Sequence, residues 1–236
     1  MAEDTLQKPK PASSPASKKS TGDLVQLEAW YYQLVAFYEK NTSLVVGIGA
    51  GVVLLVAGLL FWNYRKAQLE VEATAKLAKV AQVYKDGNLE AAILGDSTQM
   101  GLQKFVETYS GTASGEIAKF YLANALYQRN SIDSALALYK NISSRSEVLA
   151  AAALAGEAAC YEQKQQYKQA GELYRKAAAA AQNQAFEAFY LMDAGRAFEL
   201  AGEKKEALEI FEYVRKQFPL STHSRDAEKA IARLKM

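Results

Sequence analysis

The chain lacks the residues from which most catalytic and metal centres are built. Its 236 residues include one cysteine, Cys160, and one histidine, His223. A single cysteine cannot form an intramolecular disulfide, and zinc sites need several cysteine or histidine ligands at short spacings, which are absent. There is no glycine-rich loop ending in Lys-Ser or Lys-Thr to hold a phosphate. We therefore expect no enzyme activity, no cofactor and no metal, with Cys160 packed in a core and His223 on the surface.

Charge is absent from one long stretch. No charged residue lies between Lys40 and Arg65, and residues 42–64 are almost entirely apolar. At about 1.5 Å per residue, a helix of this length crosses a hydrocarbon core of about 30 Å. A signal peptide would have a shorter apolar region nearer the N-terminus, and a buried core helix rarely runs so far without a charge. The aromatic and basic residues of 61–66 are typical of a membrane exit, so the sequence predicts a transmembrane helix over 42–64.

Two different segments precede this apolar segment. Residues 1–22 are rich in lysine, proline, alanine and serine and hold few large apolar side chains, which predicts a disordered tail. Residues 24–40 (LVQLEAWYYQLVAFYEK) instead repeat apolar and aromatic residues at helical spacing. This pattern predicts an amphipathic helix at the membrane interface over 23–41. The alternative is a simple extension of the transmembrane helix.

Proline and strand-like alternation are scarce in the remainder of the chain. Pro219 is its only proline, and alanine and other helix formers dominate. Turn-forming residues such as Gly87, Gly111 and Gly202 interrupt the helical pattern at regular intervals, which predicts helices of about 12–18 residues with short connections. The expected fold class is all-α, with one N-terminal transmembrane helix followed by a solenoid of helical hairpins.

The hairpins repeat about every 35–37 residues, close to the 34 of the tetratricopeptide repeat (TPR). In each, a small residue that lets two helices approach is followed four residues later by an aromatic one: Ala135 and Tyr139, Ala170 and Tyr174, Ala207 and Phe211. The chain resembles the TPR family, most clearly in the third repeat, through Gly195, Phe198, Gly202, Ala207, Phe211 and Pro219. A solenoid over 66–236 is expected, with a degenerate hairpin at 66–110, repeats at about 114–144, 148–181 and 185–219, and a capping helix at 221–236.

The order of the segments resembles a family of single-span bacterial inner-membrane TPR proteins, the YfgM-like ancillary subunits of the SecYEG translocon. The resemblance implies a cytoplasmic N-terminus, a periplasmic TPR domain, and the translocon and periplasmic chaperones as partners. Charge favours the opposite orientation weakly, because Arg65 and Lys66 directly follow the apolar segment. The expected function is that of a membrane-anchored scaffold in protein translocation or envelope chaperoning. The alternative is a cytoplasm-facing TPR adaptor of another membrane complex.

In TPR solenoids the first helix of each hairpin lines the concave face, which makes this face the candidate protein-binding site. Its expected residues are Phe120, Asn124, Tyr127, Glu162, Phe189, Met192, Arg196 and Glu199. They mix aromatics with few charges, which favours an apolar or helical peptide, although the aromatics could instead serve mainly as core between repeats. Only Asn124 matches the TPR clamp for chaperone C-termini, so we do not expect such a clamp.

Two further features concern partners. Gly47 and Gly51 form a G-x-x-x-G spacing, which would allow close contact with another membrane helix, either in a homo-oligomer or in a larger complex. The formal net charge of the chain is only +2, which gives no reason to expect nucleic acid as a partner.

Overall fold

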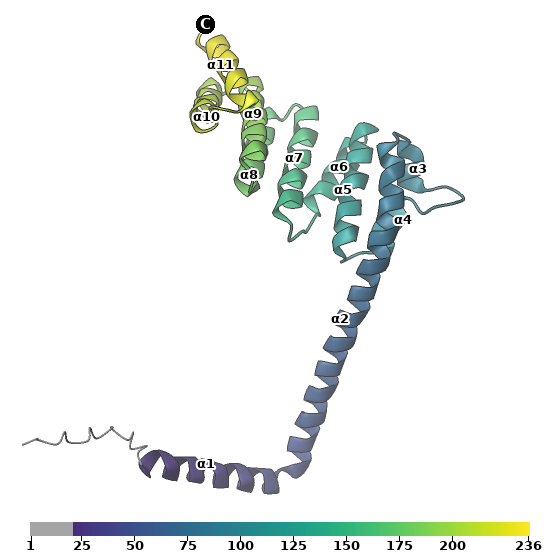
Figure 1. The fold of residues 1–236 in the computed structure, drawn as a ribbon, viewed down its shortest axis with the longest axis vertical. Helices are drawn as coiled ribbons and strands as arrows, with labels where there is room; N and C mark the ends of the chain where they lie inside the picture. The colour runs from purple at the N-terminus through teal and green to yellow at the C-terminus, as the bar shows by residue number, and fades with distance from the viewer. Residues whose placement is uncertain (1–20) are drawn as a thin grey trace, which may run out of the picture. The chain divides into compact units, whose positions relative to one another are not determined.

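The computed structural model describes residues 21–236, with side chains from residue 30 onward apart from Leu34. Within these residues every regular element is a helix, and the single β-bridge, between Gly95 and Met100, belongs to no strand (Figure 1). The prediction of an all-α fold is therefore confirmed for this part of the chain. The expected disordered tail lies outside the described residues, except for its last two residues, which begin the first helix. Residues 21–62 and 63–236 form two units, and we call the second the repeat domain.

The aromatic segment and the apolar segment belong to separate helices. Helix α1 (Thr21–Lys40) ends one residue before α2 (Thr42–Lys85) begins. Asn41 stands between them, and its side-chain amide donates a hydrogen bond of 3.1 Å to the carbonyl of Phe37. Trp30, Tyr31 and Tyr32 on α1 are 63–70% exposed. Large aromatic side chains thus face outward before the apolar segment starts.

Helix α2 combines two expected helices in one. The sequence predicted a membrane helix over 42–64 and a first hairpin helix from Lys66, whereas the structure shows a continuous helix through both. No proline or glycine stands between residues 59 and 86, so nothing in this stretch breaks the helix. The apolar part of α2 is unburied and is long and apolar enough to cross a membrane. Its later part contributes buried Ala73, Leu77 and Val80 to the repeat domain.

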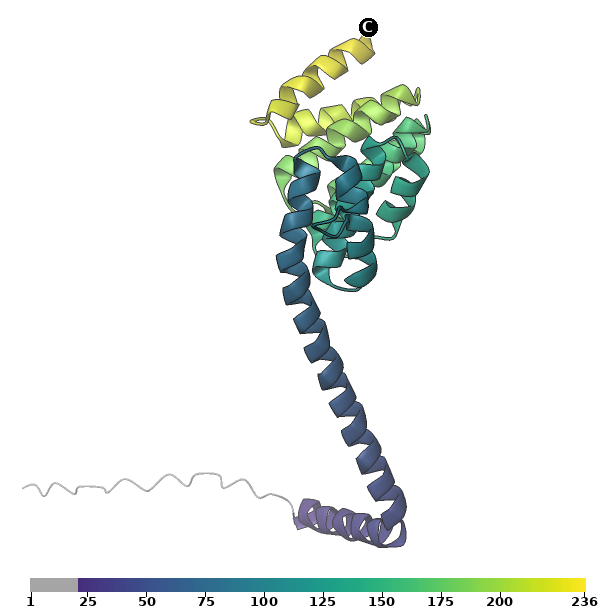
Figure 2. The same cartoon turned by 90° about the vertical axis from the view of Figure 1, so that its right-hand side faces the viewer.

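The repeat domain consists of stacked helical hairpins (Figures 1 and 2). Its first helices are α5 (Ala113–Gln128), α7 (Glu147–Gln163) and α9 (Gln184–Leu200). Each is followed by a second helix, namely α6 (Ile132–Lys140), α8 (Tyr167–Ala180) and α10 (Lys204–Gln217), and α11 (Thr222–Lys235) follows the last hairpin. The small residues Ala135, Ala170 and Ala207 are fully buried. Since no side chain larger than a methyl group separates the helices at these points, paired helices can pack closely.

Buried aromatic rings fill the space that glycines leave on neighbouring helices. The Phe211 ring lies against Gly195, where an added Cβ would come within about 2.5 Å of Cε1. The Phe198 ring lies in the same way against Gly171, and the Tyr139 ring against Gly156. Phe198 and Phe211 are each 1% exposed. These ring–glycine contacts join helices within and between hairpins into one core.

The first hairpin departs from the expected helix lengths. Its second half is divided into α3 (Leu89–Leu94) and α4 (Leu102–Thr108), both shorter than the 12–18 residues that the sequence predicted for its helices. Gly95 has a φ of +85°, a left-handed conformation that glycine adopts without strain, and the chain turns there. The backbones of Gly95 and Gly101 approach so closely that neither position has room for a side chain. This close turn explains the division.

Candidate functional site

The predicted binding residues all lie on the first helices of the hairpins, and we call the surface that these helices form the first-helix face. Phe120, Asn124 and Tyr127 belong to α5, and Glu162 belongs to α7. Phe189, Met192, Arg196 and Glu199 belong to α9. The structure thus places the predicted residues on successive repeats.

Polar side chains join each first helix to the next. Gln163 donates to the Tyr127 hydroxyl at 3.2 Å, which links α7 to α5. Arg196 forms an ion pair and hydrogen bonds with Glu162, which link α9 to α7. Each pair spans 34–36 residues, so the contacts recur with the repeat itself.

The same pattern continues into the last helix. Arg233 of α11 donates two hydrogen bonds to the Glu199 carboxylate of α9, at 2.9 and 2.6 Å. The charged groups of Glu162, Arg196 and Glu199 therefore already form ion pairs with neighbouring helices. An ionic partner would have to compete with these pairs, which makes the three residues weaker candidates for direct ligand contact than the sequence suggested.

Two hydroxyl groups tie first helices to second helices beneath this face. The Tyr139 hydroxyl donates to Oδ1 of Asn124 at 2.5 Å, and the Tyr174 hydroxyl donates to Oε2 of Glu162 at 3.1 Å. Burial raises the pKa of both tyrosines, so both remain protonated donors at neutral pH. Asn124, like Glu162, thus has a structural contact of its own.

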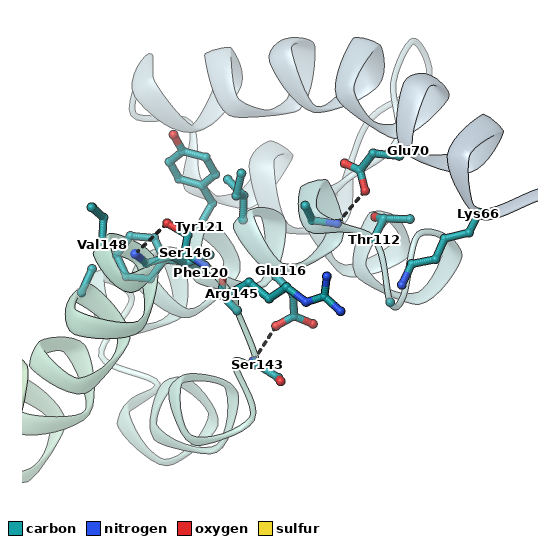
Figure 3. Close-up of a pocket in the computed structure, with 16 residues that line it drawn as sticks. Lys66, Glu70, Thr112, Glu116, Phe120, Tyr121, Ser143, Arg145, Ser146 and Val148 are labelled. Atoms are coloured by element: carbon teal, nitrogen blue, oxygen red, sulfur yellow. Dashed lines mark hydrogen bonds between the residues drawn. The ribbon is translucent and has the colours of Figure 1, made fainter. Parts of the chain in front are cut away.

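A groove of about 740 Å³ lies at the N-terminal end of the first-helix face (Figure 3). We call it the N-terminal groove. Its walls are α2, the first part of α5, the α6–α7 connection and the start of α7. The apolar side chains lining it are Ala113, Ile117, Phe120, Tyr121, Val148, Leu149 and Ala152, and the charged ones are Lys66, Glu70, Glu116 and Arg145.

Of the predicted site residues, only Phe120 lines this groove. Sequence reasoning missed Ile117, which lies three residues before Phe120 and therefore on the same helix face. It also missed Lys66 and Arg145. Those two come from α2 and from an irregular connection, and no local pattern relates them to α5.

Glu70 links α2 to the beginning of α5. Its carboxylate accepts hydrogen bonds from the backbone N–H groups of Ala113 (2.6 Å) and Ser114 (2.9 Å) and from the Ser114 hydroxyl (2.6 Å). These N–H groups have no partner within their own helix, so Glu70 caps α5 from another helix. Partial burial acts to raise the pKa of Glu70, but the hydrogen bonds outweigh it and lower the pKa below 4.5.

We expect the Glu70→Gln substitution to destabilise the repeat domain by about 1 kcal/mol at pH 7, the usual effect of losing a helix cap. Because the folded-state pKa lies below the unfolded one, this contribution is present above pH 4.5 and is lost as the pH falls through the folded pKa. The difference in melting temperature between wild type and variant should therefore become smaller as the pH is lowered from 7 to 3. Glu107→Gln, at an exposed position of α4, is the control and should change melting little. A difference in melting temperature as large at pH 3 as at pH 7 would contradict stabilisation by the ionised carboxylate of Glu70.

The other aromatic group of the first-helix face lies near the C-terminal end of the domain. Phe189 is 47% exposed, and its ring centroid lies 5.5 Å from that of Tyr190 and 6.0 Å from that of His223. Phe186 is equally exposed and stacks on Tyr190. Met192 is half-buried against the core. Phe189 thus retains free aromatic surface for a partner.

Gly47 and Gly51 lie in the apolar part of α2. A Cβ atom added at either glycine would meet nothing within 4 Å. Both positions are therefore open within the described part of the chain, and their role in helix association stays a prediction.

No group of the side chains described from residue 30 onward is arranged to hold a metal ion. Cys160 is fully buried, and burial raises the pKa of its thiol to about 11. Because a thiol must ionise to react, Cys160 is protected at neutral pH.

Comparison with solved structures identifies the fold. One similar structure is a kinesin light chain protein with nearly identical TPR-like repeats from Podosopora anserina, with a TM-score of 0.55 and 18% sequence identity. The match covers 69% of this chain and 85% of that one. The repeat domain has a TPR-like fold. A point variant of the same protein matches with 16% identity and a TM-score of 0.55, covering 69% of this chain and 84% of the variant. No family model and no curated protein matches the chain.

Proposed function

We propose that the protein is a membrane-anchored scaffold that binds other proteins at the bacterial inner membrane. The observation that carries this proposal is helix α2, which is apolar and unburied in its first part and belongs to a TPR-like domain in its second. A bilayer would cover the exposed apolar surface of the first part. The repeats would then be held at one membrane face.

TPR-like solenoids characteristically offer a surface formed by successive hairpins to a partner protein. Here the first-helix face has two regions with exposed apolar side chains, the N-terminal groove with Ile117 and Val148 and the aromatic group around Phe189. We propose that they serve protein binding in translocation or envelope chaperoning. The partners that the segment order suggests are the SecYEG translocon and periplasmic chaperones, with the N-terminus in the cytoplasm and the repeats in the periplasm.

The alternative is a cytoplasm-facing adaptor of another membrane complex, and the distribution of charge favours it. Arg65, Lys66, Lys76 and Lys79 follow the apolar segment closely, and basic residues tend to stay on the cytoplasmic side. Against this, a domain of this size can be exported largely regardless of its charge. Both alternatives place a protein-binding surface next to a membrane, and they differ in the face that carries it.

Cysteine accessibility would determine the orientation. In a Cys160→Ala background, Ser134→Cys places a thiol at an exposed position of α6, and Ser17→Cys places one before the apolar segment. We expect a membrane-impermeant maleimide to label residue 134 in intact spheroplasts and residue 17 only after lysis. The reverse pattern would contradict a periplasmic domain and support the cytoplasmic adaptor.

Photo-crosslinking would test protein binding separately from orientation. Replacing Phe189 with p-benzoylphenylalanine places a crosslinker on the first-helix face, and the same replacement at Tyr213 of α10, also 47% exposed, is the control. We expect crosslinked translocon subunits or chaperones from position 189 and few from position 213. Equal or no protein crosslinks from the two positions would contradict the scaffold.

A further inference from the structure

We propose that the N-terminal groove binds an acidic segment of a partner protein that also carries apolar side chains. This inference rests on the proposed function and adds to it the site and the chemistry of the partner. Residues 63–236 supply every side chain that lines the groove, so it belongs to the repeat domain alone.

The floor of the groove requires an apolar partner. Ile117 is 39% exposed and Val148 is 59% exposed, on two adjacent first helices, and Phe120 and Leu149 are half-buried beside them. Figure 3 shows Val148 and Tyr121 toward one side of the groove and Lys66, Glu70 and Thr112 toward the other. A segment lying along the groove would therefore meet apolar side chains at one end and polar groups at the other.

The acidic residues of the groove already have partners within the protein. Glu70 caps α5, as described above. Glu116 pairs with Lys119 at 2.7 Å and accepts a hydrogen bond from the backbone N–H of Ser143 at 2.8 Å. Neither carboxylate is available to attract a basic partner without losing an internal contact.

The basic residues of the groove have no acidic partner. Within the described part of the chain, neither Lys66 nor Arg145 lies within ion-pairing distance of a carboxylate. Both side chains are exposed and line the same groove, one from α2 and the other from the α6–α7 connection. Lys66, Arg145 and Lys119, the ion-pair partner of Glu116, supply three positive charges. Glu70 and Glu116 supply two negative ones. The net charge at the groove is therefore positive, which attracts and orients an acidic segment.

A peptide fits these features better than a lipid headgroup. Lys66 lies only two residues after the apolar segment, so an anionic headgroup could reach it. A headgroup would contact Lys66 and Arg145 but has no apolar group to cover Ile117 and Val148. A peptide with both acidic and apolar side chains satisfies both halves of the groove at once.

Selection of peptides from a random dodecapeptide phage library tests the proposal with the full-length protein in detergent micelles. We expect the enriched sequences to combine aspartate or glutamate with leucine, isoleucine or phenylalanine. The double variant Lys66→Glu, Arg145→Glu should bind the enriched peptides at least about tenfold more weakly, measured by fluorescence anisotropy in low salt. The control, Arg129→Glu with Lys205→Glu, makes the same change of charge at exposed positions outside the groove and should bind as wild type does.

Val148→Asp tests the apolar half in the same assay and should also weaken binding. The double variant's far-UV circular dichroism should match that of wild type, so that weaker binding is not caused by unfolding. Failure to enrich peptides, enrichment of basic sequences, or equal weakening by the control pair would overturn the proposal. The proposal would also be overturned if the double variant weakened binding to anionic nanodiscs but not to peptides, since the groove would then bind lipid. Peptides that bind wild type and double variant equally would overturn the groove assignment and leave the scaffold in place.

Discussion

Replacing Val53 and Leu54 with arginine is expected to release the protein from the membrane fraction. Both residues lie at the middle of the apolar segment and are 66% and 73% exposed. An arginine at the centre of a membrane helix disfavours insertion by about 2.5–3.5 kcal/mol, so two should abolish it. Alkaline carbonate extraction should leave wild type in the membrane pellet and move the variant to the supernatant.

The matched control places the same two charges elsewhere on α2. Val71→Arg with Ala75→Arg substitutes exposed positions beyond the apolar segment, which a membrane helix over 42–64 would leave outside the hydrocarbon core. This variant should remain in the pellet. If the Val53 and Leu54 variant also remained in the pellet, the apolar segment would not be the anchor. The proposal that this segment anchors the scaffold in the membrane would then be wrong.

The Phe211→Ala substitution is expected to destabilise the repeat domain by about 3–5 kcal/mol, because it removes a fully buried ring and leaves a cavity. Phe211 is 1% exposed and lies directly against Gly195, which has no side chain to fill the vacated space. For a domain of this size, the loss corresponds to a melting temperature lower by roughly 10 °C. Thermal melting followed by far-UV circular dichroism would measure it.

Tyr213→Ala on the same helix is the control for this change. Tyr213 is 47% exposed, so its loss should alter stability by less than about 1 kcal/mol. Equal melting temperatures for the two variants would mean that the small and aromatic positions of the repeat have been assigned to the wrong helix faces.

Several features of the protein follow from its sequence because their physical causes are local. The stretch of almost entirely apolar, uncharged residues at 42–64 predicts a membrane helix without reference to any other segment. The repeated pairs of a small residue and an aromatic one, such as Ala207 and Phe211, predicted a TPR-like solenoid, and the solved structures support that fold. Helix propensity predicted the all-α class in the same way. It did not predict that α2 continues through residues 64–66 or that a glycine turn divides α3 from α4.

The groove and the linked first helices were decided by tertiary structure. Glu162 and Arg196 lie 34 residues apart, and Glu70 and Ala113 lie 43 apart. The stacking of the hairpins decides which acidic side chains pair with another repeat or cap a helix. It also decides which basic side chains have no acidic partner. The sequence therefore identified the first-helix face through residues such as Phe120 and Phe189. It could not show that Glu162 pairs with Arg196 and Glu199 with Arg233, or that Lys66 and Arg145 line one groove. Side chains so far apart in sequence meet only when the chain is folded.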